Sequence, residues 1–170
     1  LRGETMGVPQ ARHRVVFVAH KEQLHYPELK LCFNYEKVPY GKIKTLQGLK
    51  LSENRAKTRE LLANVKYGEN DLSNAHKRLY GKDSFFQSIV LYDDKVVPTI
   101  RAGAADYYRY GTFEQISQGD IITASTFPQD YNFGSNAISN VCYICGMSVP
   151  PIMIKRVATE IYKQWFSLEN

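Results

Sequence analysis

Hydrophobic and polar positions along the first part of the chain predict both strand and helix. The run Arg14–Ala19 is apolar and rich in β-branched residues, which predicts a strand buried on both faces. Good helix formers over Leu51–Val65 predict a helix with Ser52 as its N-cap. Leu61 and Leu62 are the apolar positions of this helix, so we expect them to be buried.

The middle of the chain continues this mixture. A second helix is expected over Asn70–Tyr80. Phe85–Tyr92 and Lys95–Ile100 predict two strands of a hairpin, joined by a turn that contains two aspartates. A third helix is expected from Thr112 to Thr123.

The clearest pattern is a helix at the C-terminal end. Phe127–Ile144 is rich in Asn, Ser and Gly and predicts loops. Two prolines then introduce apolar residues spaced three to four apart: Ile152, Met153, Val157, Ile161 and Trp165. Because proline is well tolerated in the first turn of a helix, an amphipathic helix is expected to begin at Pro150–Pro151. Together these elements predict an α+β chain.

The composition is that of an ordinary folded domain. The chain has 170 residues, of which 44% are hydrophobic, so it can bury a core and is not expected to be disordered. No apolar run approaches the roughly 18 residues that a membrane span needs, and Leu1–His20 lacks the pattern of a signal peptide. Three cysteines are too few for a disulfide scaffold, so we expect a reducing cytoplasm.

Positive charge is concentrated in the middle of the sequence. The formal net charge is +5, and residues 42–82 carry ten of the 22 Lys and Arg residues but only four of the 17 Asp and Glu residues. Such a stretch is typical of a surface that binds phosphates. A solvated helical face explains the charge equally well, so the charge alone leaves both interpretations open.

A short N-terminal segment brings three strong hydrogen-bond donors together. Gly7–Arg14 has the sequence GVPQARHR, in which Gln10, Arg12 and Arg14 are two positions apart. If a strand begins near Gln10, these side chains lie on one face of it. The forked donors of arginine suit a phosphate or a base carbonyl. On its own, however, the pattern is more typical of a strand end with ordinary salt bridges.

Three later segments follow Gly7–Arg14 in a definite order. They are Pro98–Ile100 (PTI), Thr126–Phe133 (TFPQDYNF) and Gly146–Pro151 (GMSVPP), the last of which leads into the C-terminal helix. In this order the segments resemble the C-terminal portion of the DNA cytosine methyltransferases that act at carbon 5. The order is far more specific than any single motif. The basic stretch 42–82 also falls where the resemblance places the target-recognition region.

The resemblance implies a chain in three parts. Residues 1–20 would supply a strand and the arginine segment of a Rossmann-like catalytic domain that uses S-adenosylmethionine. Residues 21–115 would form an inserted target-recognition domain. Residues 116–170 would return to the catalytic domain and end in its final helix. Because an incomplete sheet exposes apolar surface, we expect the isolated chain to form a homodimer or to need the N-terminal catalytic half of the enzyme.

The resemblance also implies roles in binding double-stranded DNA. Arg14 would reach O2 of the flipped cytosine and its phosphate, and Arg12 would brace the catalytic carboxylate. Gln10 would support the DNA backbone, and Thr99 would contact a phosphate near the target. Basic side chains of the recognition region would make the remaining DNA contacts: Lys42, Lys44, Arg55, Arg59, Lys77, Arg78 and Arg101.

The cofactor-binding residues implied by the resemblance lie near the C-terminal end. Ser148 and Val149 would line the S-adenosylmethionine pocket at the start of the last helix. Met147 stands where the family has an asparagine, so a polar cofactor contact there is in doubt. Asp120 and Ser117 stand where the family has a glutamate and, commonly, a threonine.

Several groups that the reaction needs are not found in this sequence. The family uses a cysteine after proline as nucleophile, a glutamate in an E-N-V segment and a glycine-rich turn for the methyl donor. Cys32, Cys142 and Cys145 follow Leu, Val and Ile. We therefore predict part of a DNA (cytosine-5-)-methyltransferase that has no activity alone, either a fragment or a subunit. A bacterial or phage cytoplasm, including a restriction–modification system, is the expected setting.

Two other functions remain as alternatives. The first is a catalytically inactive, stand-alone protein that binds DNA in a sequence-specific way, although the intact Ser148–Val149 segment argues mildly against it. The second is a basic RNA-binding domain. The sequence lacks the aromatic signature of the common RNA-binding sheets, so this alternative ranks last.

Cysteine and tyrosine residues offer two further candidate sites. Cys142 and Cys145 form a single C-x-x-C pair, which gives too few ligands for structural zinc, so we expect no metal. We expect them to be small buried side chains on a strand. Tyr107, Tyr108 and Tyr110 are the best candidates for stacking on bases, although aromatic residues at such places more often serve packing.

Overall fold

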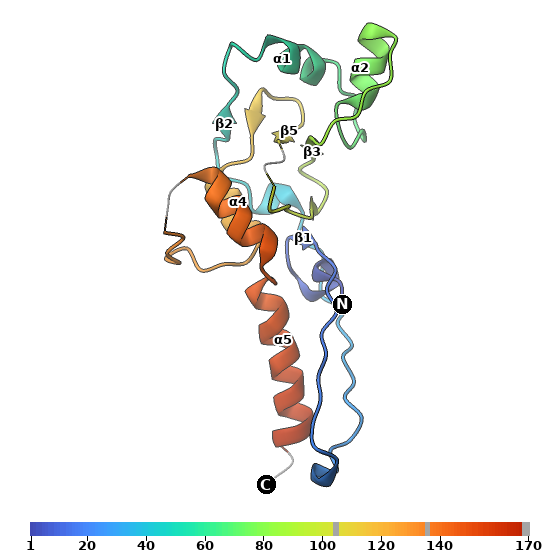
Figure 1. Cartoon of the computed structure of the whole chain (residues 1–170), viewed down its shortest axis with the longest axis vertical. Helices are drawn as coiled ribbons and strands as arrows, with labels where there is room; N and C mark the ends of the chain where they lie inside the picture. Colours follow the sequence, from blue (N-terminus) through green and yellow to red (C-terminus); the bar gives the residue numbers. More distant parts are fainter. Residues whose placement is uncertain (104–105, 135–136, 168–170) are drawn as a thin grey trace.

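The larger of two small sheets lies between the helices, in a computed structural model that describes residues 1–103, 106–134 and 137–167 (Figure 1). The edge strand β3 runs parallel to its neighbour β5, and β6 is antiparallel to both of its neighbours. The order across the sheet is β2 (Leu49–Lys50), β6 (Glu114–Gln115), β5 (Tyr107–Arg109) and β3 (Ile89–Leu91).

The smaller sheet joins the N-terminal segment to the middle of the chain. β1 (Gln10–Ala11) runs parallel to β4 (Val97–Pro98), with Gln10 opposite Val97. A short 3₁₀ turn, η1 (Gly3–Met6), precedes β1 and packs against it. This sheet therefore fixes the arginine segment next to the loop that contains Thr99.

Helices occupy both ends of an elongated molecule. α1 (Ala56–Ala63) and α2 (Ser73–Tyr80) lie at one end, and α5 (Pro151–Ile161) extends to the other (Figure 1). A π-helical turn, η4 (Tyr162–Phe166), continues α5. The remaining helical elements are α3 (Gln118–Ala124), α4 (Ile138–Met147), η2 (Glu22–Leu24) and η3 (Tyr40–Lys42).

Apolar side chains form three separate cores. Alternate residues of β3 face opposite sides of the sheet, so Ile89 and Leu91 enter a first core with α3 and α4, while Val90 enters a second core with α1 and α2. Both faces of the parallel pair are thus covered, as is usual for parallel strands. The third core lies between η1 and α5, where Met6 and Val8 pack against partners that include Met153 and Val157.

The predicted helices are present in the expected parts of the chain, but several begin at other residues than predicted. Leu61 and Leu62 are buried, as expected. Their helix begins only at Ala56, and Ser52 is not its N-cap. α5 has a proline in its first turn, as predicted. The helix expected from Thr112 begins only at Gln118, because the residues before it form β6.

The predicted hairpin is wrong. A turn does follow β3, and the Lys95 amide donates to the Tyr92 carbonyl at 3.1 Å. However, β3 pairs with β5, and β4 pairs with β1 instead of folding back on β3. Pro98 has no amide hydrogen, which weakens β4 as a hairpin strand. Val97, the residue before Pro98, is buried in the first core, so its apolar character is explained without a hairpin.

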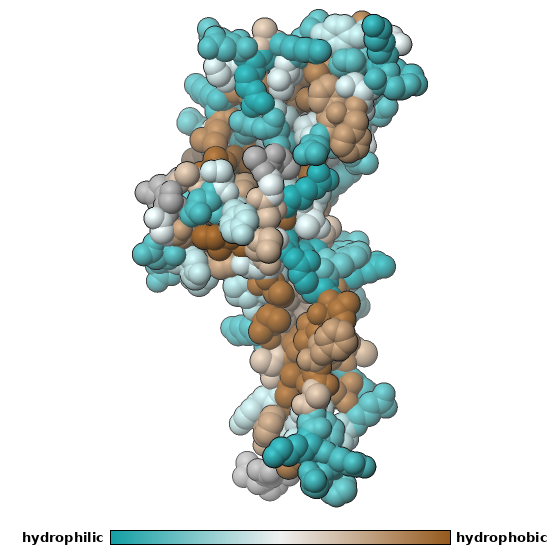
Figure 2. Space-filling model, in the orientation of Figure 1, coloured by the Kyte–Doolittle hydropathy of each residue, from teal (hydrophilic) through white to brown (hydrophobic). Residues whose placement is uncertain are grey.

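The strand predicted over Arg14–Ala19 is also not formed. This extended segment makes no backbone hydrogen bonds beyond Arg14 within the described residues, so it has no neighbouring strand. Val16 packs on the third core, while Val15 is 78% exposed and Phe17 is 94% exposed. Apolar surface is visible beside α5 in the lower half of Figure 2. One face of this segment is therefore half-buried and the other is exposed, whereas the prediction was burial on both faces.

The loop predicted up to Ile144 contains a helix. α4 carries Val141, Cys142 and Cys145 at its buried positions, so the two cysteines lie on a helix and not on a strand. The three buried residues are one and then three positions apart, which is typical of one face of a helix. Their predicted burial is confirmed.

By length and composition, Ile138–Phe166 is apolar enough to cross a membrane. It is interrupted at Ser148, which has an extended backbone, and Pro150 precedes α5. Residues of its two halves pack in different cores, Cys142 in the first and Met153 in the third. The expectation that no stretch is long and apolar enough is therefore not met by length and composition, although the structure divides this stretch into two helices.

Candidate functional site

Arg12 links three segments that are far apart in the sequence. Its side chain is 1% exposed, and its Nη1 donates to the Ile100 carbonyl at 3.0 Å and to Gln10 Oε1 at 3.3 Å. Its Nη2 donates to the Gly146 carbonyl at 2.5 Å. Arg12 thus connects the segments Gly7–Arg14, Pro98–Ile100 and Gly146–Pro151 in space. Its buried Nε remains without an acceptor among the described residues.

Gln10 is completely buried in the same network. Its Nε2 donates to Ser125 Oγ at 3.3 Å and to the Ala124 carbonyl at 3.4 Å, and its Oε1 accepts from the Ile100 amide at 3.1 Å. The amide is therefore engaged within the protein. The predicted support of the DNA backbone by Gln10 would have to act through the neighbours that it positions.

Arg14 lies at the edge of this network and is only half-buried. Its Nη1 donates to the His13 carbonyl at 2.8 Å, and its Nη2 donates weakly to the Ser148 carbonyl at 3.5 Å. No carboxylate of the described chain forms an ion pair with it. Arg14 therefore carries an uncompensated charge next to the turn between α4 and α5.

Thr99 and Arg101 belong to a loop that Tyr107 holds in place. The Tyr107 hydroxyl donates to the Thr99 carbonyl at 3.1 Å and accepts from the Arg101 amide at 2.9 Å. Thr99 Oγ1 donates to the Ala11 carbonyl at 2.5 Å, whereas the Arg101 side chain is exposed. Tyr107 and its neighbour Tyr108 are each 1% exposed, which favours packing over base stacking.

The Ser148 and Val149 turn is rigid. Ser148 Oγ and its amide both donate to the Ile144 carbonyl, at 2.6 and 3.1 Å, and Val149 packs on the third core. A Cβ at Gly146 would lie 2.5 Å from the Arg101 carbonyl carbon, so the turn approaches the Thr99–Arg101 loop through a glycine. The predicted cofactor residues and the loop predicted to contact DNA are thus neighbours.

A buried ion pair stabilises the junction between η3, β5 and α3. Arg109 Nη2 donates to Asp120 Oδ2 at 2.7 Å, and both side chains are almost completely buried. Tyr40 donates to the same carboxylate at 2.6 Å, and Asp120 also forms a capping box with Ser117. In the sequence, Ser117 and Asp120 stood out only as the positions where the family has a threonine and a glutamate; the capping box and the pairing with Arg109, 11 residues before Asp120, were missed.

The ionisation of this network is shifted in the expected directions. Burial alone would raise the pKa of Asp120, but hydrogen bonds from Tyr40, the Thr45 amide and Arg109 outweigh it and hold that pKa below its ordinary value. Burial and the neighbouring carboxylate raise the pKa of Tyr40 far above its usual range. Asp120 is therefore ionised at neutral pH and Tyr40 is protonated.

Most of the basic residues predicted to contact DNA are already paired with carboxylates. Arg55 forms an ion pair with Asp106 at 2.8 Å, and Arg59 donates to the Leu51 carbonyl at 3.2 Å while it stacks on Phe113. Four further predicted contacts form the pairs Lys42–Glu36, Lys44–Asp93, Lys77–Asp83 and Arg78–Glu69, whereas Arg14 and Arg101 form no ion pair within the described residues. A phosphate would have to compete with these carboxylates.

Four other lysines of the basic stretch are exposed and form no ion pair within the part of the chain that the structure describes. They are Lys50, Lys57, Lys66 and Lys82. We did not predict them as DNA contacts, because the sequence does not show which charges find a partner. Lys57 Nζ lies 5.1 Å from the centre of the Tyr80 ring, and none of the four has to leave a carboxylate of the described chain to contact a phosphate, so they are the better candidates.

No group of three metal-ligating side chains occurs among residues 1–103, 106–134 and 137–167. Burial raises the pKa of the Cys142 thiol to about 11, and it also raises that of Cys145. Thiols of this kind are protonated and unreactive at neutral pH.

Residues 1–163 match the family model described as C-5 cytosine-specific DNA methylase. This match covers almost the whole chain and includes all the site residues discussed above. A search of curated proteins found no match.

Proposed function

Because the chain belongs to the C-5 cytosine-specific DNA methylase family, we propose that it supplies DNA recognition and one wall of the cofactor site to such an enzyme. The family methylates cytosine in DNA. We infer that this chain corresponds to the C-terminal portion, with an inserted recognition domain over residues 21–115, and that it is inactive without a companion. A restriction–modification enzyme or a phage enzyme would fit this role.

The Arg12 network is the observation that carries the proposal. One buried guanidinium joins Gln10, the Ile100 carbonyl and the Gly146 carbonyl, so it gathers three motif segments. Its free Nε is a buried donor, and such donors are rarely left without an acceptor. We propose that a carboxylate of a companion catalytic half accepts a hydrogen bond from this Nε. This contact would be the bracing of the catalytic carboxylate that the resemblance implies for Arg12.

The Ser148 and Val149 turn fits S-adenosylmethionine as a wall and not as a complete pocket. The Ser148 hydroxyl and amide are both bonded to Ile144, so they are not free donors in this conformation. Val149 and the exposed Met147 offer apolar surface instead. The cofactor supplies the methyl group when bound, and this chain would contribute shape and apolar contact to its site.

The unpaired segment after Arg14 supports the need for a companion. Val15 and Phe17 expose apolar side chains, and the backbone from Val15 to Ala19 has free donors and acceptors within the described chain. An exposed extended edge of this kind is a template for a further strand. We propose that the N-terminal catalytic half, and not a second copy of this chain, supplies it.

Fluorescence anisotropy of the full chain with a panel of short labelled duplexes, at several salt concentrations, tests DNA recognition. We expect a preference for one sequence and a steep salt dependence. Arg14→Ala should weaken binding by about tenfold or more, since hydrogen bonds to charged groups contribute about 1.5–3 kcal/mol. Arg2→Ala removes the same charge from an exposed position and is the matched control.

Each result of this titration has a defined meaning. Equal losses for Arg14→Ala and Arg2→Ala would contradict the role of Arg14. Lys57→Gln should lower the salt slope by about one, whereas Lys77→Gln, which removes a paired lysine, should change it less. Tight sequence-specific binding that does not depend on Arg14 would favour the stand-alone DNA-binding alternative.

A further inference from the structure

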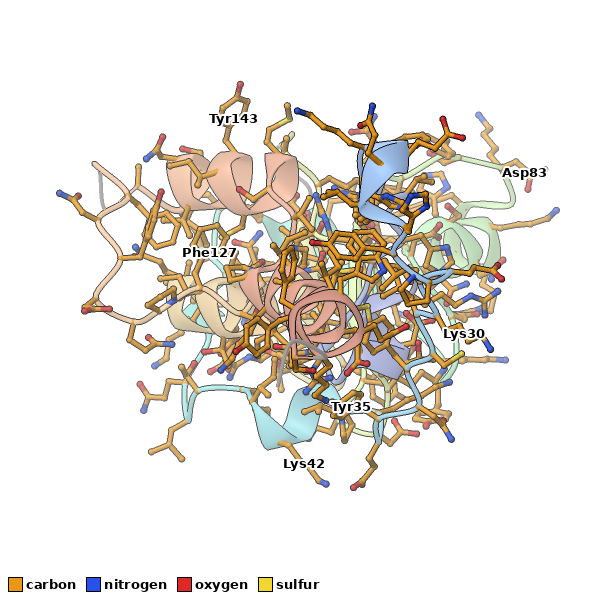
Figure 3. The ribbon with its side chains drawn as sticks, turned by 90° about the horizontal axis from the view of Figure 1, so that it is seen from below. Lys30, Tyr35, Lys42, Asp83, Phe127 and Tyr143 are labelled. Carbon is orange, nitrogen blue, oxygen red and sulfur yellow. The ribbon has the colours of Figure 1, made fainter. Side chains whose placement is uncertain are left out.

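A cavity of about 250 Å³ lies between α5 and the segment that carries Tyr35. Its polar lining comes mainly from one face of α5, and Tyr35 closes the other side; Figure 3 shows Tyr35 beside the helix, which is seen end-on. The residues that matter here are Tyr35, Lys155, Arg156, Thr159, Glu160 and Lys163. Neither the arginine segment nor the Ser148 turn lines this cavity.

The Arg156 guanidinium is held rigidly at the cavity. Its Cζ lies 3.4 Å from the centre of the Tyr35 ring, and the Tyr35 amide is anchored to the Thr5 carbonyl at 2.9 Å. On its other side lies Gly7, where an added Cβ would come within 2.8 Å of Nη1. The guanidinium therefore lies between a ring and a glycine at the edge of the cavity.

The charge around Arg156 is not balanced. Its Nη1 is buried and has no hydrogen-bond partner, and neither Arg156 nor Lys155 forms an ion pair with a carboxylate of the described residues. Lys163 does have a partner, Glu160, at 3.0 Å. The cavity thus contains three cations and one carboxylate, and two of the cations are uncompensated.

We propose that this cavity binds a phosphate group. A fixed arginine fork beside a lysine is the arrangement that recognises phosphate oxygens through charge-assisted hydrogen bonds. The cavity has room for a phosphate group but is smaller than typical sites for drug-sized ligands. The phosphate belongs either to a nucleic-acid backbone or to a small phosphorylated molecule. The proposal does not rest on the function inferred above.

Titration of the ¹⁵N-labelled full chain with inorganic phosphate, at constant ionic strength set by sodium chloride, tests this site. We expect saturable shifts of the Tyr35 amide and the Arg156 Nε signals. Arg156→Gln should weaken phosphate binding by about tenfold or more, and Lys155→Gln should weaken it to a smaller extent. Lys30→Gln is the control, because the contacts of Lys30 with Gln164 are made by its backbone.

Shifts that do not saturate, or that persist unchanged in Arg156→Gln and Lys155→Gln, would overturn the proposal. The Lys155 side chain is exposed and forms no ion pair within the described residues, so its variant remains informative even if Arg156→Gln unfolds. Competition for the cavity by a duplex would identify a nucleic-acid backbone as the source. Competition by a nucleoside monophosphate alone would identify a small molecule. A duplex that fails to bind anywhere would contradict the proposed function but not this site.

Discussion

Replacement of Asp120 by asparagine tests whether the buried ion pair holds η3 and β5 to α3. The substitution keeps the size of the side chain but removes its charge. Arg109 would then be buried with only Glu114, 3.2 Å from its Nη1, as a charged partner. Asparagine also cannot accept all the hydrogen bonds that the carboxylate receives from Tyr40, Thr45 and Arg109.

The expected loss of stability follows from the burial of the pair. Removing one partner of a buried ion pair typically costs about 3–5 kcal/mol, because the other charge remains buried. Glu114 offsets part of this cost, so we expect Asp120→Asn to lower the free energy of unfolding by about 3 kcal/mol. Domains are stable by only about 5–15 kcal/mol in total. The variant should therefore unfold at a clearly lower urea concentration.

The difference in free energy of unfolding between the wild type and Asp120→Asn should also depend on pH. The folded pKa of Asp120 lies below its ordinary value, so the ionised carboxylate stabilises the fold above the unfolded pKa of about 4. This contribution is lost as pH falls through the folded pKa. The stability of the wild type and of Asp120→Asn should therefore converge below about pH 4, in urea unfolding followed by circular dichroism.

Asp83→Asn is the matched control, since Asp83 is an exposed residue in a surface pair with Lys77. Such pairs contribute about 0–1 kcal/mol, so this variant should unfold almost like the wild type. The reasoning is refuted if Asp120→Asn loses no more stability than Asp83→Asn, or if the gap between wild type and Asp120→Asn stays constant down to acid pH.

Two further predictions concern packing and thiol chemistry. Gly146→Ala should lower the free energy of unfolding by about 1–3 kcal/mol or more, because its Cβ would collide with backbone, whereas Gly103→Ala has free space and should be nearly neutral in the same urea titration. Dithionitrobenzoate should react rapidly with the exposed Cys32 alone, while Cys142 and Cys145 should react only after unfolding; rapid labelling of all three would contradict their burial.

Elements specified by neighbouring residues could be predicted from the sequence. The Pro-Pro start of α5 and the burial of Leu61 and Leu62 depend on local spacing, and both are confirmed. Strand pairing was not predictable in this way, because β1 meets β4 from 87 residues away, as Gln10 opposite Val97 shows. The Asn, Ser and Gly residues around α4 led to the prediction of a loop there, although the spacing of the buried positions of α4 is that of a helix.

The candidate site shows the same limit. Motif order was sufficient to select Arg12 and Arg14, which the structure places beside the Gly146 to Val149 turn. Charge counting could not separate free from paired cations. The partner of Arg55 is Asp106, which lies 51 residues later, and only the fold brings the two together.

Several of the unsatisfied groups within the described residues lie near α5 and the N-terminal segment. The second core packs residues of α1 and α2 against Val90 of β3 and Tyr108 of β5. The third core has α5 on one side and the extended segment with Val15 and Phe17 exposed on the other. The orphan donors of Arg12 and Arg156 lie in this same part. A companion that covered this part would therefore bury Val15 and Phe17 and stabilise the packing of α5, because both side chains are exposed beside the third core.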